Sequence, residues 1–359
     1  MSVAAELLTW REKVIKDTVE YLNQLREFAT PVQERIIDAL IECDMNFTKA
    51  SKLLGTDHRG NQRSLKSLKA KAEIRQQPIN GLVDAGVIRI LTTKHNVKDK
   101  TEKTHLVIPD TQCKPNIDME YLRVAGEYIV NRKPDVIIHI GDHADMESLS
   151  SYDKGKKKAE GRRVNLDIEA AINGMNTLLK PLYDLQQKEL SDFGEVRYKP
   201  IMILTLGNHE QRIMRHVEAN PELSGFLSYD SLKYEEMGWE VHDFLKPVIV
   251  DGVSYCHYMA NPMTGKPYGG AAMNVLKNVG ESFTQGHRQT LDVATRFLPS
   301  SGRQQWAIIA GAYYEHYEEY KGHQGNYHWR GLIVKHNVQS GSYNPMFVDL
   351  AYLKKRFKK

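Results

Sequence analysis

The stretch DVIIHIGDHAD, residues 135–145, decides the fold. An apolar run leads directly into a glycine and then into two carboxylates. HLVIPDTQ (105–112) and PIMILTLGNHE (200–210) have the same order, with polar residues placed just after an apolar run. Short apolar runs bounded by glycine indicate buried strands, and open α/β sheets place their sites at the carboxyl ends of strands. The sequence therefore predicts an α/β fold with a site assembled from several strand ends.

Two later segments complete an ordered set of five: His257, and GHRQ at 286–289. The set DTQ, GDHAD, GNHE, H and GHRQ resembles the calcineurin-like metallophosphoesterase superfamily, whose pattern runs D-x-H, G-D-x-x-D, G-N-H-D/E, H and G-H-x-H. The resemblance covers roughly residues 104–349, and the stretch 149–163 together with GNHEQR also resembles a subgroup carried by tailed bacteriophages. It implies a four-layered α/β/β/α sandwich of two mixed sheets flanked by helices.

The resemblance also implies two divalent metal ions that share one bridging carboxylate, Asp142. Such a pair, ~3.5–4 Å apart, lowers the pKa of a bridging water and clamps the phosphate oxygens. The family pattern gives His209 the task of protonating the leaving oxygen, and Asp145 the task of orienting that imidazole. The residues that would hold the two ions are Asp110, Gln112, Asp142, Asn208, His257, His287 and Gln289.

Gln112 and Gln289 depart from the pattern, because the family has histidine at both positions. Both belong to the same ion, and an amide oxygen is a harder and weaker ligand than imidazole. We therefore expect Mn²⁺ there, with Mg²⁺ possible, or a site that fills only with substrate; Zn²⁺ or Fe is possible at the His-rich site. Two neighbours are able to compensate: His143, which we expect to contact substrate or solvent, and Cys113, which we expect to be an ordinary loop thiol.

The N-terminal part of the chain predicts a small all-α domain. The formal net charge of the whole chain is +4, but residues 46–75 hold eight Lys/Arg and two Asp/Glu, against five and nine in residues 1–45. Helical periodicity over 5–28 and 31–43 precedes FTKASKLLG and NQRSLKSLKAKAEIR, which a turn at TDHRG joins in the plan of a helix-turn-helix. The residues that we expect to contact DNA are Lys52, Arg59, Asn61, Gln62, Arg63, Lys66 and Ser67. A helical bundle with a solvated basic face is the alternative, and the first helix is either a dimer seam or part of this bundle.

The predicted organisation is a helical module over 1–78, a linker over 79–103 and a phosphoesterase domain over 104–359. A basic loop at the expected mouth of the site would steer a phosphate-rich polymer toward it, unless it is simply a solvated loop. Its cations are Lys154, Lys156, Lys157, Lys158, Arg162 and Arg163. The stretch 313–331 predicts a hairpin of half-buried aromatic strands with its tip at KGHQGN.

Cys43, Cys113 and Cys256 form no CxxC pair, which fits a reducing cytoplasm, that of the host if the protein is phage-encoded. No apolar run approaches 18 residues, so we expect no membrane association.

We expect a metal-dependent phosphodiesterase acting on DNA, an endonuclease or nickase targeted by the N-terminal module. A first alternative is a phosphomonoesterase or protein phosphatase, although Met146 stands where phosphoprotein phosphatases of the family carry arginine. A second alternative is a DNA-binding regulator whose metal fold is inert, an alternative that the two glutamines keep open.

Overall fold

The computed structural model describes residues 18–20, 22–23, 25–43, 46–75, 87–95, 102–318 and 321–357. The chain divides into two compact units. The first comprises Met1–Asn80 and Gln187–Val196, and the second comprises Gly81–Gln186 and Arg197–Lys359. Among the helices that are described, none is both long enough and apolar enough to cross a bilayer.

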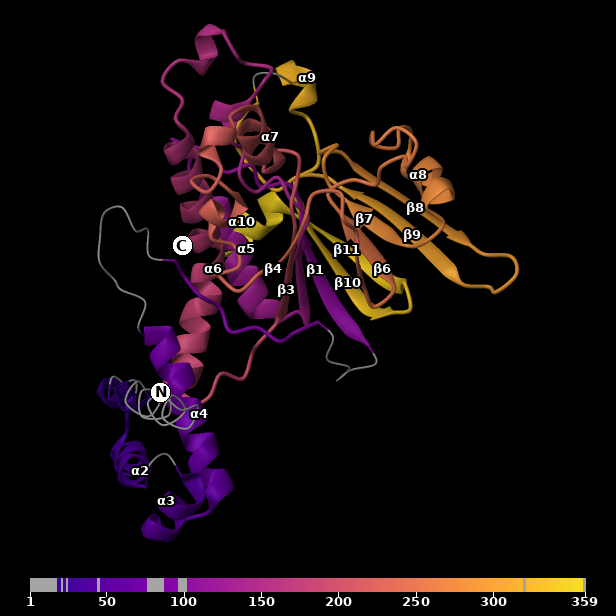
Figure 1. Cartoon of the computed structure of the whole chain (residues 1–359). Helices are drawn as coiled ribbons and strands as arrows, with labels where there is room; N and C mark the ends of the chain where they lie inside the picture. The colour runs from indigo at the N-terminus through magenta and orange to yellow at the C-terminus, as the bar shows by residue number, and fades with distance from the viewer. Residues whose placement is uncertain are drawn as a thin grey trace, which may run out of the picture. The chain divides into compact units, whose positions relative to one another are not determined.

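The second unit is built on a six-stranded mixed sheet in the order β11-β10-β1-β2-β3-β4 (Figure 1). The strands β1 (Lys103–Ile108), β2 (Val136–His139), β3 (Ile201–Thr205) and β4 (Glu240–His242) run parallel, with β4 at one edge. The antiparallel strands β10 (Gly331–Gln339) and β11 (Ser342–Asp349) complete the other edge. The predicted α/β class is confirmed, as are the three strands expected from the apolar runs before Asp110, Gly141 and Gly207.

A second sheet of five strands has the order β5-β6-β7-β9-β8. Its strands are β5 (Val248–Val250), β6 (Val253–Cys256), β7 (Phe283–Gln285), β9 (Gln304–Ala310) and β8 (Leu291–Phe297). Side chains from both sheets form one buried cluster, in which Val107, Ile138 and Ile203 of the first sheet share a core with Val250 and Ile308 of the second. The two sheets therefore pack face to face.

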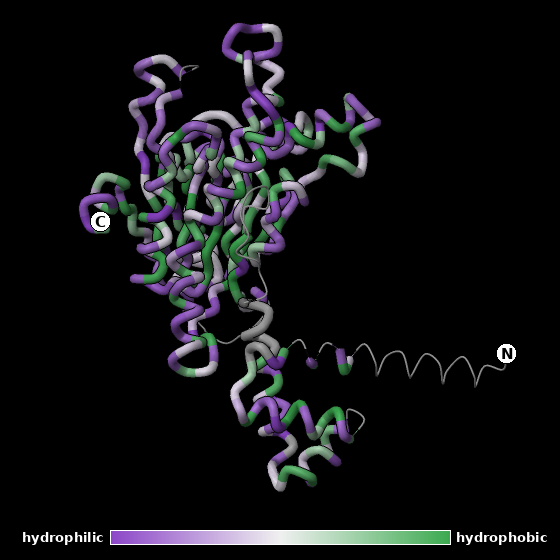
Figure 2. Tube along the Cα trace, turned by 90° about the vertical axis from the view of Figure 1, so that its left-hand side faces the viewer, coloured by the Kyte–Doolittle hydropathy of each residue, from purple (hydrophilic) through white to green (hydrophobic). Residues whose placement is uncertain are grey.

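Helices cover the outer faces of the two sheets. Side chains alternate along a strand, so Leu106 and Ile108 of β1 face a different core from Val107. That outer core takes residues from α5 (Glu120–Arg132), α6 (Val164–Phe193) and α10 (Leu350–Phe357), and α8 (Ala272–Val279) covers the second sheet. Hydrophobic residues accordingly concentrate in the strands at the centre of this unit (Figure 2). The remaining short elements are α7 (Gln211–Ala219) and four 3-10 turns, Glu147–Leu149, Lys157–Ala159, Pro221–Leu223 and Tyr229–Leu232.

The first unit is helical, as predicted. It contains a 3-10 turn (Leu25–Phe28), α2 (Pro31–Glu42), α3 (Phe47–Leu54) and α4 (His58–Arg75). Leu25, Ile37 and Leu68 are fully buried in its core. Gly55 ends α3 in the left-handed conformation at φ 63°, and α4 begins only three residues later. The expected turn over TDHRG is therefore wrong in extent, because His58, Arg59 and Gly60 are already helical. Residues 5–17 of the first predicted helix, which includes the suggested dimer seam, lie outside the described part.

Two segments differ from expectation. Within the predicted linker, Ile90 is buried and its N–H donates to the Met237 carbonyl at 3.0 Å, so residues 87–95 belong to the second unit. The predicted aromatic hairpin at 313–331 is wrong, because its described residues before Gly331, where β10 begins, form no strand and include the one-turn helix α9 (Gly322–Gly325). The side chain of Asn326 bonds both the N–H and the C=O of Glu318, at 2.9 and 2.8 Å, which closes a compact loop in place of a strand ladder.

Candidate functional site

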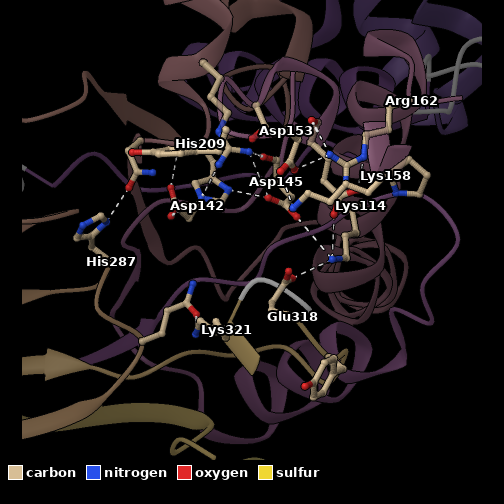
Figure 3. A pocket seen from close by; sticks show the side chains of 18 of the residues that line it. Lys114, Asp142, Asp145, Asp153, Lys158, Arg162, His209, His287, Glu318 and Lys321 are labelled. Atoms are coloured by element: carbon tan, nitrogen blue, oxygen red, sulfur yellow. Dashed lines mark hydrogen bonds and ion pairs between the residues drawn. The ribbon is translucent and has the colours of Figure 1, made fainter. Parts of the chain in front are cut away.

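The five sequence segments meet at one edge of the two sheets. Asp110, Asp142 and His209 follow β1, β2 and β3, while His257 and His287 follow β6 and β7 of the other sheet. They surround or underlie a cavity of about 920 Å³ that Asp142, His209 and His287 help to line. Figure 3 shows these three side chains converging on that cavity. The predicted convergence of strand ends is therefore present in the structure.

Four of the predicted metal ligands form a close group. The ligand atoms of Asp142, His257 and His287 all lie within 4.8 Å of one another, a spacing able to hold a metal ion. The Asn208 amide oxygen lies 2.9 Å from His257 Nε2 and 2.7 Å from His287 Nδ1. One carboxylate, one amide oxygen and two imidazoles are a donor set that suits a divalent transition metal.

The charged states of Asp142, His257 and His287 depend on one another. Burial would raise the pKa of Asp142, but the His209 and His257 imidazoles lower it well below its usual range. Burial would lower the pKa of His257, but Asp142, whose Oδ2 lies 3.3 Å from His257 Nε2, raises it to about 9. Burial and the neighbouring His257 lower the pKa of His287 to about 4. The metal-free group thus holds one carboxylate and one protonated imidazole.

Glu210 holds the loop that carries Asp142, a role that sequence reasoning missed. Its two carboxylate oxygens accept backbone N–H groups from Asp142, His143, Ala144 and Gly207 at 2.7–3.0 Å. Position 207 requires glycine because its backbone lies close to the Asp142 side chain: a Cβ at this position would lie 2.1 Å from Asp142 Oδ1. The GNHE segment therefore fixes the position of the β2 loop as well as supplying ligands.

His209 and Asp145 form the predicted pair. His209 Nδ1 lies 2.7 Å from Asp145 Oδ1, and His209 Nε2 lies 3.7 Å from Asp142 Oδ2. Burial would lower the pKa of His209, but Asp142 and Asp145 raise it, which favours the protonated imidazole. The Nη2 of Arg212, which the sequence analysis did not single out, lies 3.1 Å from His209 Nε2, and its Nη1 donates to the Asp145 carbonyl at 2.8 Å. This arrangement can deliver a proton from Nε2 toward the cavity.

Lys114 is a third residue whose role the sequence analysis missed. Its ammonium lies between three carboxylates, 2.9 Å from Glu318, 3.1 Å from Glu147 and 3.8 Å from Asp145. Burial alone would lower its pKa, but Glu318 and the other two carboxylates raise it, so the lysine remains charged. It neutralises the acidic side of the cavity next to the His209–Asp145 pair.

The predicted second metal position has a different character. Asp110 Oδ2 and both polar atoms of the Gln112 amide are buried without a hydrogen-bond partner. Burial, together with Asp142, raises the pKa of Asp110 to about 7. Gln289 is already engaged, because its Oε1 accepts from the Tyr314 hydroxyl at 2.7 Å and from the Lys321 ammonium.

The predicted phosphate-steering loop is only partly at the cavity. Lys156, Lys158 and Arg162 line it, and Lys158 and Arg162 pair with Asp153 at 2.5 and 2.8 Å. The cavity lining does not include Lys154, Lys157 or Arg163. Further cations of the wall come from other segments, Lys114, Arg212, Arg288 and Lys321. The lysine run does not reveal these four, because each lies outside it, although Arg288 stands within the GHRQ segment and Arg212 directly follows GNHEQ.

The expectation for His143 is wrong. Its side chain is fully buried, with Nε2 donating to the Ala171 carbonyl at 2.9 Å and Nδ1 2.8 Å from Thr111 Oγ1. Burial lowers its pKa to about 4, so the imidazole is a neutral packing element beneath the site. Cys113 is likewise fully buried, and burial raises the pKa of its thiol, which makes it less reactive than an exposed loop thiol.

In the first unit, the exposed residues of the predicted DNA-contact set are Lys52, Arg59, Gln62, Arg63 and Lys66. The expected DNA contact of Asn61 is wrong. Its side chain is 5% exposed, and its Nδ2 donates to Ser51 Oγ at 3.0 Å and to Thr56 Oγ1 at 2.7 Å. These bonds tie α4 to α3 and to the turn between them, so the amide is not available to a base edge. The side chain of Ser67 lies outside the described part of the structure.

No protein-family model matches this chain. Two relatives encoded by mycobacteriophages do match it over 216 residues. The "Gene 54 protein" of Mycobacterium phage D29 is 34% identical, and that of Mycobacterium phage L5 is 25% identical. Each match covers 58% of this chain and 78% of the relative.

Proposed function

The chain belongs to the family of the Gene 54 proteins of mycobacteriophages L5 and D29, and we propose that it is a metal-dependent phosphodiesterase acting on DNA. One observation carries this proposal: a group of metal-ligating side chains adjoins a histidine–carboxylate pair in one cavity. His209 Nε2 lies 3.7 Å from Asp142 Oδ2, so the proposed proton donor lies beside a proposed metal ligand. A purely structural metal site has no use for a positioned proton donor.

The fold that we propose is the four-layered sandwich of the calcineurin-like metallophosphoesterases. The two face-to-face sheets, the outer helices and the five motifs at strand ends support this assignment. Asp142, Asn208, His257 and His287 would hold a divalent ion. Such an ion acts as a Lewis acid on a phosphoryl oxygen and on the attacking water.

The side chains of this chain have distinct tasks in the proposed reaction. Asp145 accepts the proton on His209 Nδ1, so the protonated imidazole presents its second, transferable proton on Nε2. His209 gives that proton to the leaving oxygen. Arg212 adjoins the same nitrogen, where its guanidinium can bind a phosphate oxygen as the proton departs. Lys114 keeps the neighbouring carboxylates neutralised.

DNA is the proposed substrate because the chain carries two sets of cations of the kind that bind a polyanion. The cavity wall carries Lys156, Lys158 and Arg162, and the first unit exposes basic residues on α3 and at the start of α4. The α3–α4 pair, joined by the three residues Gly55–Asp57, would serve as a helix-turn-helix that selects the cutting position.

A nicking assay on supercoiled plasmid with Mn²⁺ tests this proposal. We expect open circles from the wild type and none from His209→Ala; Glu218→Gln, a change at an exposed position of α7, should cut like the wild type. A protein that shifts DNA in a gel but does not cut it in the presence of any divalent metal would be a binding regulator. Faster hydrolysis of p-nitrophenyl phosphate than of bis-(p-nitrophenyl) phosphate would instead identify a phosphomonoesterase.

A further inference from the structure

The Asp110 side of the centre is poorly equipped to hold a second metal ion. Its donors are one carboxylate and two neutral amides, and an amide oxygen is a weak ligand. One of these amides is also occupied: Gln289 Oε1 already accepts hydrogen bonds from Tyr314 and from Lys321. A cation bound through Gln289 would have to displace both donors.

Lys321 brings a positive charge to this position. Its side chain lines the same cavity as Asp142 and His287, and Figure 3 shows it on the side away from Lys158 and Arg162. Nζ donates to Gln289 Oε1 and, at 3.2 Å, to the Tyr314 hydroxyl. Lys114, Lys158 and Arg162 all pair with carboxylates, whereas these two hydrogen-bond partners of Lys321 are neutral. Burial lowers the pKa of Lys321, whereas Asp110 and Glu318 raise it, so the ammonium acts on these two carboxylates and on whatever enters the cavity.

The pair Tyr314 and Gln289 keeps the ammonium in place. Tyr314 is fully buried and Gln289 is 4% exposed, so their polar atoms hold fixed positions. Together with the lysine they form a closed triangle of hydrogen bonds, because the Tyr314 hydroxyl also donates to Gln289 Oε1 at 2.7 Å. A histidine at position 289 would offer a single ring nitrogen to either an ion or the lysine. The glutamine oxygen accepts from two donors at once.

We infer that the ammonium of Lys321 takes the electrostatic role of the second metal ion, so that the centre works with one divalent ion and one lysine. This inference rests on the proposed function and departs from the expected pair of ions. One ion and one lysine carry three positive charges in place of four. That smaller charge suits a phosphodiester, which carries one negative charge, better than a phosphomonoester, which carries about two near neutral pH. The lysine also repels a second cation from the Gln112–Gln289 side.

The number of bound ions is the first test, and it is independent of activity. The full chain is titrated with Mn²⁺ while free Mn²⁺ is followed by its electron paramagnetic resonance signal. We expect one tight equivalent with the spectrum of an isolated ion, and loss of that equivalent in His257→Ala. Two tight equivalents, or an exchange-coupled spectrum of a dinuclear centre, would overturn the inference.

The charge of Lys321 is the second test. Lys321→Met removes the charge and keeps most of the stem, Lys321→Arg keeps the charge, and Lys277→Met is a matched change at an exposed position of α8. We expect kcat for bis-(p-nitrophenyl) phosphate to fall about 100-fold in Lys321→Met. Part of that loss should be recovered in Lys321→Arg, and Lys277→Met should match the wild type. Binding of the single Mn²⁺ should be as tight in Lys321→Met as in the wild type, which also shows that the variant is folded.

The two tests separate the inference from the proposed function. A wild type that binds one Mn²⁺ but hydrolyses no diester refutes the phosphodiesterase and retains the one-ion centre. A wild type that hydrolyses diesters and binds two ions supports the phosphodiesterase and refutes the one-ion centre. A Lys321→Met variant that retains full activity would show that the ammonium has no such role.

Discussion

His257 carries a proton in the metal-free chain, and a metal ion bound at this residue would have to displace it. Burial opposes its charge, but Asp142 raises its pKa to about 9, well above pH 7. Because only the neutral imidazole binds metal, we expect Mn²⁺ binding at pH 7 to release about one proton from this residue. The apparent affinity should rise with pH and level off above about pH 9. Calorimetry in two buffers of different ionisation enthalpy measures the proton count.

The same group predicts how the metal-free protein responds to pH. A histidine whose pKa is raised from 6.5 to about 9 on folding contributes stability that is fully present below pH 6.5 and is lost as the pH rises through 9. We therefore expect metal-free protein to lose stability across this window, while metal-loaded protein does not. Asp142→Asn removes the charge that raises the pKa and should abolish both effects, whereas a change at exposed His323 should alter neither. Metal binding without proton release at pH 7 would contradict this account.

Helix α4 holds a buried polar residue, Asn61, and an exposed one, Arg63, for which we expect different roles. The Asn61 amide joins Ser51 and Thr56 inside the first unit, whereas Arg63 is exposed. We expect Asn61→Ala to destabilise this unit by about 1–3 kcal/mol, because the buried hydroxyl of Ser51 and the more exposed hydroxyl of Thr56 both lose a hydrogen-bond partner. Arg63→Ala should leave stability within about 0.5 kcal/mol and weaken DNA binding. Thermal unfolding and a gel shift on both variants separate the roles; equal effects of the two changes on stability would show that Asn61 is not structural.

At the scale of elements, the loop after β2 depends on the turn after β3. Glu210 accepts four backbone N–H groups through its two oxygens. Glu210→Gln replaces one acceptor oxygen by a donor that meets N–H groups, so we expect a loss of several kcal/mol in stability and weaker Mn²⁺ binding through displaced Asp142. Glu218→Gln on α7 is the matched control. Unfolding in urea and the Mn²⁺ titration measure the two effects, and a Glu210→Gln protein that binds Mn²⁺ like the wild type would show that Asp142 needs no such support.

The elements that could be predicted from sequence are those in which pattern and position coincide. The strands before Asp110 and Asp142 are continuous apolar runs, and the polar residues that follow them are fixed to the strand ends by adjacency alone. The burial of the Asn61 amide could not be predicted, because the residue type alone does not tell whether a polar side chain on a basic helix faces the core or the solvent. Arg212, Lys114 and Lys321 also escaped prediction, since only tertiary packing brings them to the cavity. The hairpin was predicted from the alternation of aromatic residues, which is typical of strands. The prediction was wrong because the side chain of Asn326 bonds the backbone of Glu318 and closes a loop there.

At the scale of the whole molecule, the proposed function assigns DNA binding and cleavage to different sets of residues. The exposed cations Lys52, Arg59, Arg63 and Lys66 lie in the first unit, and His209 lies in the second. We expect the fourfold alanine variant of those cations to lose DNA affinity and to reduce the slope of log K against log salt by about 1 for each phosphate contact removed. Its hydrolysis of bis-(p-nitrophenyl) phosphate should match the wild type, because that small diester needs only the cavity. His209→Ala should show the opposite pair of results. If the fourfold variant lost hydrolysis of the small diester while remaining folded, the first unit would be part of the catalytic machinery and not a device for placing the cut.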